Sequence, residues 1–216
     1  MNIELKKRIQ TSTVLLLLFF TMIISHFVLL YTLIVGSVLI WLEFSNLNSK
    51  IFKKNNYLNF LSNLLFLIYI SLFSSALFIL FLNTSTKAFL IFTILICILT
   101  DIGGLVFGRF FKGRKLTSVS PNKTVWGAVG SLFFSIFFLL FFFFMGLVSI
   151  NLHIILFVLV TSMASQIGDI FISFVKRKAK VKDTGKLLPG HGGLLDRLDG
   201  ILLGVPVGVF IFYIFS

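Results

Sequence analysis

Residues 131–144 read SLFFSIFFLLFFFF, an almost unbroken aromatic and aliphatic run inside a longer apolar stretch at 125–147. Such a surface would aggregate in water, whereas the hydrocarbon of a bilayer accepts a helix of about 20 apolar residues. The whole chain shares this character, since 58% of its 216 residues are hydrophobic, 12% are charged and the mean hydropathy is +1.08. Soluble domains carry about 25% charged residues. The sequence therefore predicts an all-α, polytopic transmembrane helical bundle.

About seven stretches have the length and composition of a membrane span. They lie at 12–28, 29–45, 58–82, 87–108, 125–147, 152–175 and 198–215. Residues 12–45 could instead form one long tilted helix, so the turn that we expect near His26 decides the number of spans.

The basic residues favour two helices in this region, because positively charged loops stay on the cytoplasmic side and each span changes the side. With two helices, four basic clusters lie inside: Lys6–Arg8, Lys50–Lys54, Arg109–Lys123 and Lys176–Arg197. Only Lys87, among 19 basic residues, would then lie outside. The net charge of +12 thus indicates membrane topology and anionic headgroups, and we expect no nucleic-acid partner.

The seven acidic residues are unevenly distributed along the sequence. Two lie in the first fifth and five lie beyond residue 100: Glu4 and Glu43, then Asp101, Asp169, Asp183, Asp196 and Asp199. We therefore expect N-terminal membrane helices over residues 1–95, and catalytic membrane helices with cytoplasmic loops over residues 96–216.

Three of these carboxylates suggest a metal site. Asp169 falls within an apolar span, where an unpaired charge costs about 2.5–3.5 kcal/mol on insertion scales, so a cation should compensate it. Asp196 and Asp199 stand three residues apart, on one face of a helix that should start at the membrane surface. Paired carboxylates of this kind bind Mg²⁺, which often shares its ligands with substrate phosphates.

Glycine and basic residues next to these carboxylates are suited to phosphate. Gly190, Gly192 and Gly193 surround His191 just before the predicted helix, so that backbone N–H groups could approach an anion. A basic run from Lys176 to Lys182 precedes them. The sequence therefore predicts cations for phosphate beside carboxylates for metal.

Residues 173–199, SFVKRKAKVKDTGKLLPGHGGLLDRLD, resemble without a gap the C-terminal pattern of the phosphatidate cytidylyltransferases, also called CDP-diglyceride synthases. Residues 165–169 and 120–124 are similar to the family as well, so the likeness covers roughly residues 98–204. The sequence departs from the family at Ile102, Gly104, Leu105 and Trp126, and Asp101 is therefore given no role.

The resemblance implies that the phosphate of phosphatidic acid attacks the α-phosphorus of CTP, giving CDP-diacylglycerol and pyrophosphate. It implies Mg²⁺, with a second cation as an option, held by Asp169, Asp196 and Asp199. The other catalytic residues that it implies are Lys123, Lys182, Asp183, His191 and Arg197. The substrate-binding residues that it implies are Ser120, Lys123, Ser165, Ser173, Lys176, Arg177, Gly192 and Gly193.

Other functions fit the sequence less well. A CTP-dependent polyprenol or lipid kinase would share the substrates but would transfer the terminal phosphate. A CDP-alcohol phosphotransferase would need an Asp-Gly-x-x-Ala-Arg run, which is absent. A transporter could use an intramembrane Asp, but the chain has no internal repeat.

We expect an enzyme of a bacterial inner membrane with its active site toward the cytoplasm, in contact with membrane lipids, and base rates suggest a homodimer.

Overall fold

The computed structural model describes residues 3–111, 113–117, 120, 123–185, 187 and 192–215, without the side chains of residues 3–9, 12 and 215. All seven elements in the described part are helices, which confirms the predicted fold class. They are α1 (Ile3–Ile24), α2 (His26–Ile51), α3 (Asn56–Leu82), α4 (Thr84–Phe111), α5 (Val125–Phe144), α6 (Leu152–Lys178) and α7 (Leu195–Phe215).

The expected break near His26 is present, because α1 ends at Ile24 and α2 begins at His26. Ser25, between them, has an extended backbone (φ −121°), and its side chain accepts a hydrogen bond from the Val28 backbone N–H at 3.5 Å. An extended N-cap serine of this kind ends one helix and starts the next.

Six helices, α2 to α7, are long and apolar enough to cross a membrane, so the chain is an integral membrane protein. The apolar part of α1 is Thr13–Ile24, which is shorter than the roughly 20 residues that a span needs. The first of the seven expected spans, at 12–28, therefore stays a prediction.

The chain divides into two compact units. Unit 1 comprises Met1–Thr84 and Val175–Leu198, and unit 2 comprises Ser85–Phe174 and Asp199–Ser216. The expected functional division at residue 95 stays a prediction.

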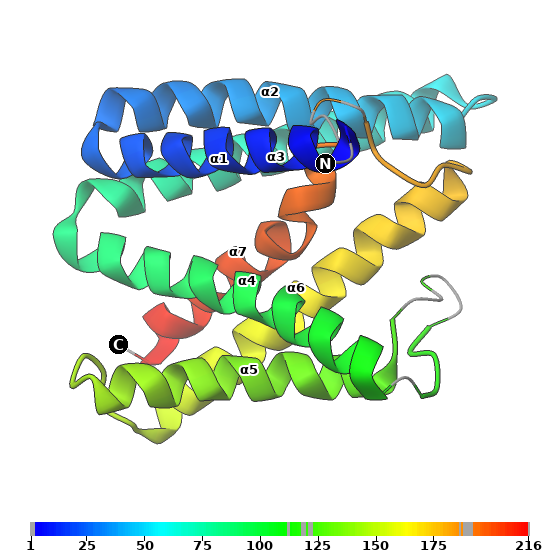
Figure 1. Ribbon diagram of the computed structural model, residues 1–216. Coiled ribbons are helices and arrows are strands. Elements are labelled where there is room, and N and C mark those ends of the chain that lie inside the picture. The colour runs from blue at the N-terminus through cyan, green and yellow to red at the C-terminus, as the bar shows by residue number, and fades with distance from the viewer. Residues whose placement is uncertain are drawn as a thin grey trace. The chain divides into compact units, whose positions relative to one another are not determined.

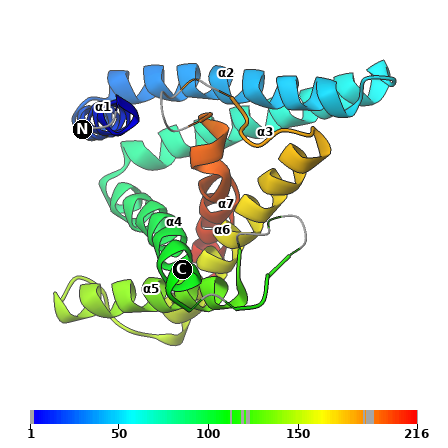
Figure 2. The same ribbon diagram turned by 45° about the vertical axis from the view of Figure 1, so that its right-hand side comes forward.

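In unit 1, α2 and α3 run side by side (Figures 1 and 2). The buried Asn48 on α2 donates from Nδ2 to both the backbone oxygen and Oδ1 of Asn59 on α3, each at 2.9 Å. The rings of Phe44 and Phe66 stack with their centroids 3.9 Å apart. Hydrogen bonds between polar side chains of neighbouring helices substitute for the hydrophobic effect, which does not favour helix association in lipid.

In unit 2, α4 and α5 approach closely through glycines. A β-carbon on Gly103 would lie 2.5 Å from the backbone oxygen of Gly130, and one on Gly130 would collide with Phe107. The buried Thr100 hydroxyl donates to the Ser162 hydroxyl of α6 at 2.8 Å, while Ser131 of α5 donates to the Thr100 carbonyl at 2.7 Å. Small residues and hydroxyl groups are the usual means of packing helices in a membrane.

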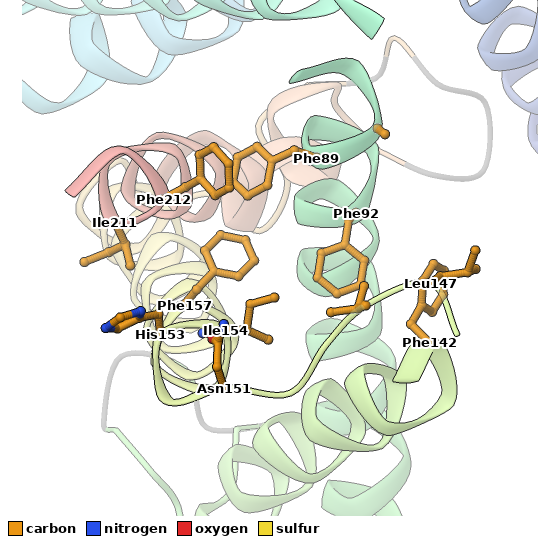
Figure 3. Close-up of a pocket in the computed structure, with 12 residues that line it drawn as sticks. Phe89, Phe92, Phe142, Leu147, Asn151, His153, Ile154, Phe157, Ile211 and Phe212 are labelled. Carbon is orange, nitrogen blue, oxygen red and sulfur yellow. Dashed lines mark hydrogen bonds between the residues drawn. The ribbon is translucent and has the colours of Figure 1, made fainter. Parts of the chain in front are cut away.

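Unit 2 also contains an apolar cavity of about 570 Å³ between the ends of its helices (Figure 3). Phe89 of α4, Phe157 of α6 and Phe212 of α7 form its aromatic wall, with Asn151 at its edge. Phe89 lies 12 residues from Asp101 along α4, or about 18 Å at the usual helical rise. The cavity therefore lies beside the N-terminal part of α4, away from Asp101.

The glycine contact between α4 and α5 gives the first prediction. Gly130→Val should lower the unfolding temperature in detergent, because a branched side chain cannot fit against Phe107 and the Gly103 carbonyl. Gly36→Ala is the matched control, since nothing lies within 4 Å of a β-carbon there and alanine favours a helix. Equal unfolding temperatures for the two variants would contradict the packing.

Candidate active site

Unit 2 gathers three carboxylates from three helices. Asp101 lies on α4, Asp169 on α6 and Asp199 on α7, and each of the three interacts electrostatically with the other two. Asp199 is buried, with 8% of its surface exposed. Carboxylates this close in an apolar surrounding repel one another and need positive charge nearby.

Glycines allow α6 and α7 to meet at these carboxylates. A β-carbon on Gly168 would lie 2.6 Å from the backbone oxygen of Asp199, and one on Gly200 would lie 2.5 Å from Ser165 Oγ. The Gly200 N–H donates to Asp199 Oδ1 at 2.9 Å. The buried Ser165, predicted to bind substrate, therefore lies directly against α7 beside Asp199.

Lys123 supplies a cation to this group through an ion pair with Asp169. The two side chains are 23% and 29% exposed. Backbone hydrogen bonds in the loop before α5 hold Lys123 in place. The Lys123 N–H donates to the Ser120 carbonyl at 3.0 Å, and the Lys123 carbonyl accepts from the Leu116 N–H at 2.7 Å. The other lysine–aspartate pair that the structure describes, Lys176–Asp196, involves none of these three carboxylates.

The chemistry of the unit 2 carboxylates suits a hard divalent cation. Three carboxylate groups are oxygen donors of the type that Mg²⁺ binds. In the part of the chain that the structure describes, however, no three His, Cys, Asp or Glu side chains are already arranged around a common metal position. A metal ion at Asp169 would compete with Lys123 for the same carboxylate.

The second group lies in unit 1, around Asp196 in the first turn of α7. Its Oδ1 pairs with Lys176 Nζ at 2.7 Å, and its Oδ2 accepts from the backbone N–H groups of Thr184 at 2.8 Å and Gly193 at 3.1 Å. Gly192 has φ +87°, and a β-carbon there would lie 3.2 Å from Asp196 Oδ2. Asp196 thus stabilises the segment before α7 through these hydrogen bonds. Its metal-binding role stays a prediction.

The remaining predicted residues are placed as follows. Ser173 donates from Oγ to Asp169 Oδ1 at 3.5 Å, which connects it to the carboxylates of unit 2 by a long hydrogen bond. The side chains of Arg177, Lys182, Asp183 and Arg197 are exposed. His191 lies outside the described residues.

Sequence reasoning missed two acidic residues that the structure places in these groups. Asp101 was set aside because its neighbours depart from the family pattern. Glu43, on α2, is buried, and it accepts hydrogen bonds from Thr184, Leu194 and Leu195. A carboxylate inside an apolar stretch, which singled out Asp169, was the available signal for Glu43 as well.

These helices and side chains define a polytopic membrane protein with carboxylates in and beside its apolar helices, several of which are paired with a lysine or with backbone donors. The chain belongs to the cytidylyltransferase family, whose model matches residues 4–215.

Curated relatives agree with this assignment. The chain is 42% identical over 126 residues to a phosphatidate cytidylyltransferase of Staphylococcus haemolyticus, 42% identical over 123 residues to that of Staphylococcus saprophyticus, and 40% identical over 121 residues to that of Staphylococcus aureus. Each match covers 55% of this chain and 46% of the relative. The chain spans about half the length of the curated relatives it matches.

The Lys123–Asp169 ion pair gives the second prediction. Lys123→Met should lower the free energy of unfolding by about 1–3 kcal/mol, because Asp169 loses its cation while two other carboxylates repel it. Adding Asp169→Asn should restore part of this loss by removing the unpaired charge. Unfolding curves in detergent measure both effects.

Lys115→Met is the control for this pair, since Lys115 is exposed in the same loop and should change stability by less than about 0.5 kcal/mol. If Lys123→Met behaves like this control, the ion pair contributes nothing to stability.

Proposed function

We propose that this protein transfers the cytidylyl group of CTP to phosphatidic acid, giving CDP-diacylglycerol and pyrophosphate. The observation that carries the proposal is the group of three carboxylates and Lys123 among apolar helices of a cytidylyltransferase-family chain. The curated names of the staphylococcal relatives support phosphatidic acid as the acceptor.

The reaction needs charge neutralisation more than covalent help. An oxygen of the lipid phosphate attacks the α-phosphorus of CTP, a new P–O bond forms, and the bond to the β-phosphate breaks to release pyrophosphate. Both reactants are anions, so positioning and electrostatic stabilisation provide most of the catalysis. Lys123, held beside the carboxylates, is in our proposal the side chain that contacts phosphate oxygens.

We propose that Mg²⁺ is the cofactor, bound by Asp169 and Asp199 with help from Asp101. When bound, the ion would neutralise phosphate charge and orient CTP. The fit rests on the oxygen donors of these side chains and on their electrostatic repulsion of one another, which a bound cation would relieve.

The proposal also covers the membrane in which the protein lies and the side that its active site faces. The clusters Lys50–Lys54, Arg109–Lys123 and Lys176–Arg197 favour a cytoplasmic active site, since basic loops stay inside. The bacterial relatives support a bacterial cell membrane, and the inner membrane stays a prediction. A homodimer stays a prediction from base rates.

The test uses the full chain, purified in detergent, with phosphatidic acid, Mg²⁺ and CTP labelled in turn at the α- or γ-phosphate. We expect α-label to enter lipid and γ-label to appear in pyrophosphate. Asp199→Asn should lower the rate by at least about 100-fold, because a ligand that also stabilises the transition state is lost. Chelation of Mg²⁺ should stop the reaction, and restored Mg²⁺ should recover it.

Two outcomes would overturn the proposal. Transfer of γ-label into lipid would show a CTP-dependent lipid kinase. Folded protein that elutes as a single species and consumes no CTP would exclude both enzymes.

A further inference from the structure

Glu43 is a buried carboxylate in the half of the chain to which we assigned no chemistry. It lies on α2 inside an apolar span and is 3% exposed. Its side chain accepts three hydrogen bonds from residues 141 to 152 positions later: Thr184 Oγ1 to Oε2 at 2.8 Å, Leu194 N to Oε1 at 2.9 Å and Leu195 N to Oε2 at 2.9 Å. All of these residues belong to unit 1.

Two of these donors belong to the start of α7. The helix begins at Leu195, and the first N–H groups of any helix have no partner within the helix. A carboxylate at this place satisfies those donors and is favoured by the helix dipole. Glu43 thus supplies from another helix the cap that α7 does not have from its own sequence, since Leu194 precedes it.

The segment before α7 is shaped around this carboxylate. A β-carbon on Gly185 would lie 2.5 Å from Glu43 Oε1, and one on Gly193 would lie 2.5 Å from Oε2. Either side chain would displace Glu43 from its donors. Gly193, which we predicted as a phosphate-binding residue, therefore also has a packing reason to be glycine.

Thr184 links Glu43 to the predicted site. Its Oγ1 lies 2.8 Å from Glu43 Oε2 and 3.0 Å from Asp196 Oδ2. A hydroxyl has one hydrogen and can donate it to only one of these two carboxylates at a time. Asp196 in turn pairs with Lys176. Glu43 is thus coupled through Thr184 to two residues that we predicted as ligands of metal and phosphate.

We infer that Glu43 is a positioning residue for the segment 184–196, acting through Thr184 and the first turn of α7. The expected effect of Glu43 on kcat rests on the proposed function, whereas its effect on the segment 184–196 does not. Burying a carboxylate costs several kcal/mol unless it is hydrogen-bonded, and here the donors are two backbone N–H groups and a hydroxyl that would lose this acceptor beside an apolar side chain. What the carboxylate provides is a single defined arrangement of Asp196, Thr184 and Gly193.

The experiment measures two quantities on Glu43→Gln, an isosteric variant that turns an amide N–H₂ toward groups that donate. Hydrogen–deuterium exchange at Leu194 and Leu195 should become at least about tenfold faster, because both N–H groups lose a charged acceptor. The kcat for cytidylyl transfer should fall about 10–100-fold, with KM for CTP within threefold, because the segment is mispositioned rather than lost.

Asn46→Ala, exposed on α2 one turn from Glu43, is the matched control and should match the wild type in both measurements. Exchange around the Asn48–Asn59 contact should stay unchanged in Glu43→Gln, which separates a local effect from a loss of α2–α3 packing. If Glu43→Gln does not fold, Thr184→Val removes the hydroxyl that joins Glu43 to Asp196 and should lower kcat by a similar factor. Exchange at Leu194 and Leu195 should then stay near the wild-type rate, because Glu43 still accepts from both N–H groups.

Wild-type exchange and kcat in Glu43→Gln would overturn the inference. Faster exchange with unchanged kcat would reduce Glu43 to a helix cap and overturn its positioning role. If the wild-type protein transfers no cytidylyl group, the proposed function fails, while the exchange result still decides whether Glu43 holds the segment.

Discussion

A carboxylate inside an apolar helix is poorly solvated and needs donors or cations from other parts of the protein, and this constraint organises the described structure. Glu43 is met by a hydroxyl and two backbone N–H groups, and Asp169 by Lys123. Asp199 has the N–H of Gly200, but it also has two carboxylates as neighbours. The donors around Glu43 fix the segment before α7 in place. The carboxylates around Asp199 repel one another, and a metal ion or a cationic side chain would relieve that repulsion.

Glycine and hydroxyl side chains make these arrangements possible. Gly168 lets α6 approach the backbone of Asp199, and Gly185 and Gly193 leave room for Glu43. Thr100 is hydrogen-bonded to neighbouring helices on either side of α4. The glycines of the signature segment are therefore explained in part by packing around carboxylates, in addition to the phosphate contacts that the resemblance implies.

Hydropathy and charge predicted the helices well, including the break near His26, because both depend on local composition. The partners of the carboxylates were harder to predict than the helices. The spacing of Asp196 and Asp199 predicts one helical face, but no spacing tells which helix packs beside Asp169, and its partner Lys123 is 46 residues away. Asp101 was set aside because its neighbours depart from the family pattern, and Glu43 because it lies in the N-terminal part of the chain, far from the other carboxylates in the sequence. The contacts of both residues join segments that are distant in sequence. Sequence similarity to relatives identifies the family. The contacts of Asp101, Asp169 and Glu43 are visible only in the three-dimensional structure.

The proposed reaction depends most on a cation bound at Asp101, Asp169 and Asp199. Electron paramagnetic resonance of Mn²⁺, used in place of Mg²⁺ with the purified full-length chain, measures such binding without any substrate. We expect saturable Mn²⁺ binding that competes with Mg²⁺ and weakens at least about tenfold in Asp199→Asn, because one carboxylate ligand is lost. Undiminished binding in Asp199→Asn, or no saturable binding in the folded wild type, would contradict this expectation.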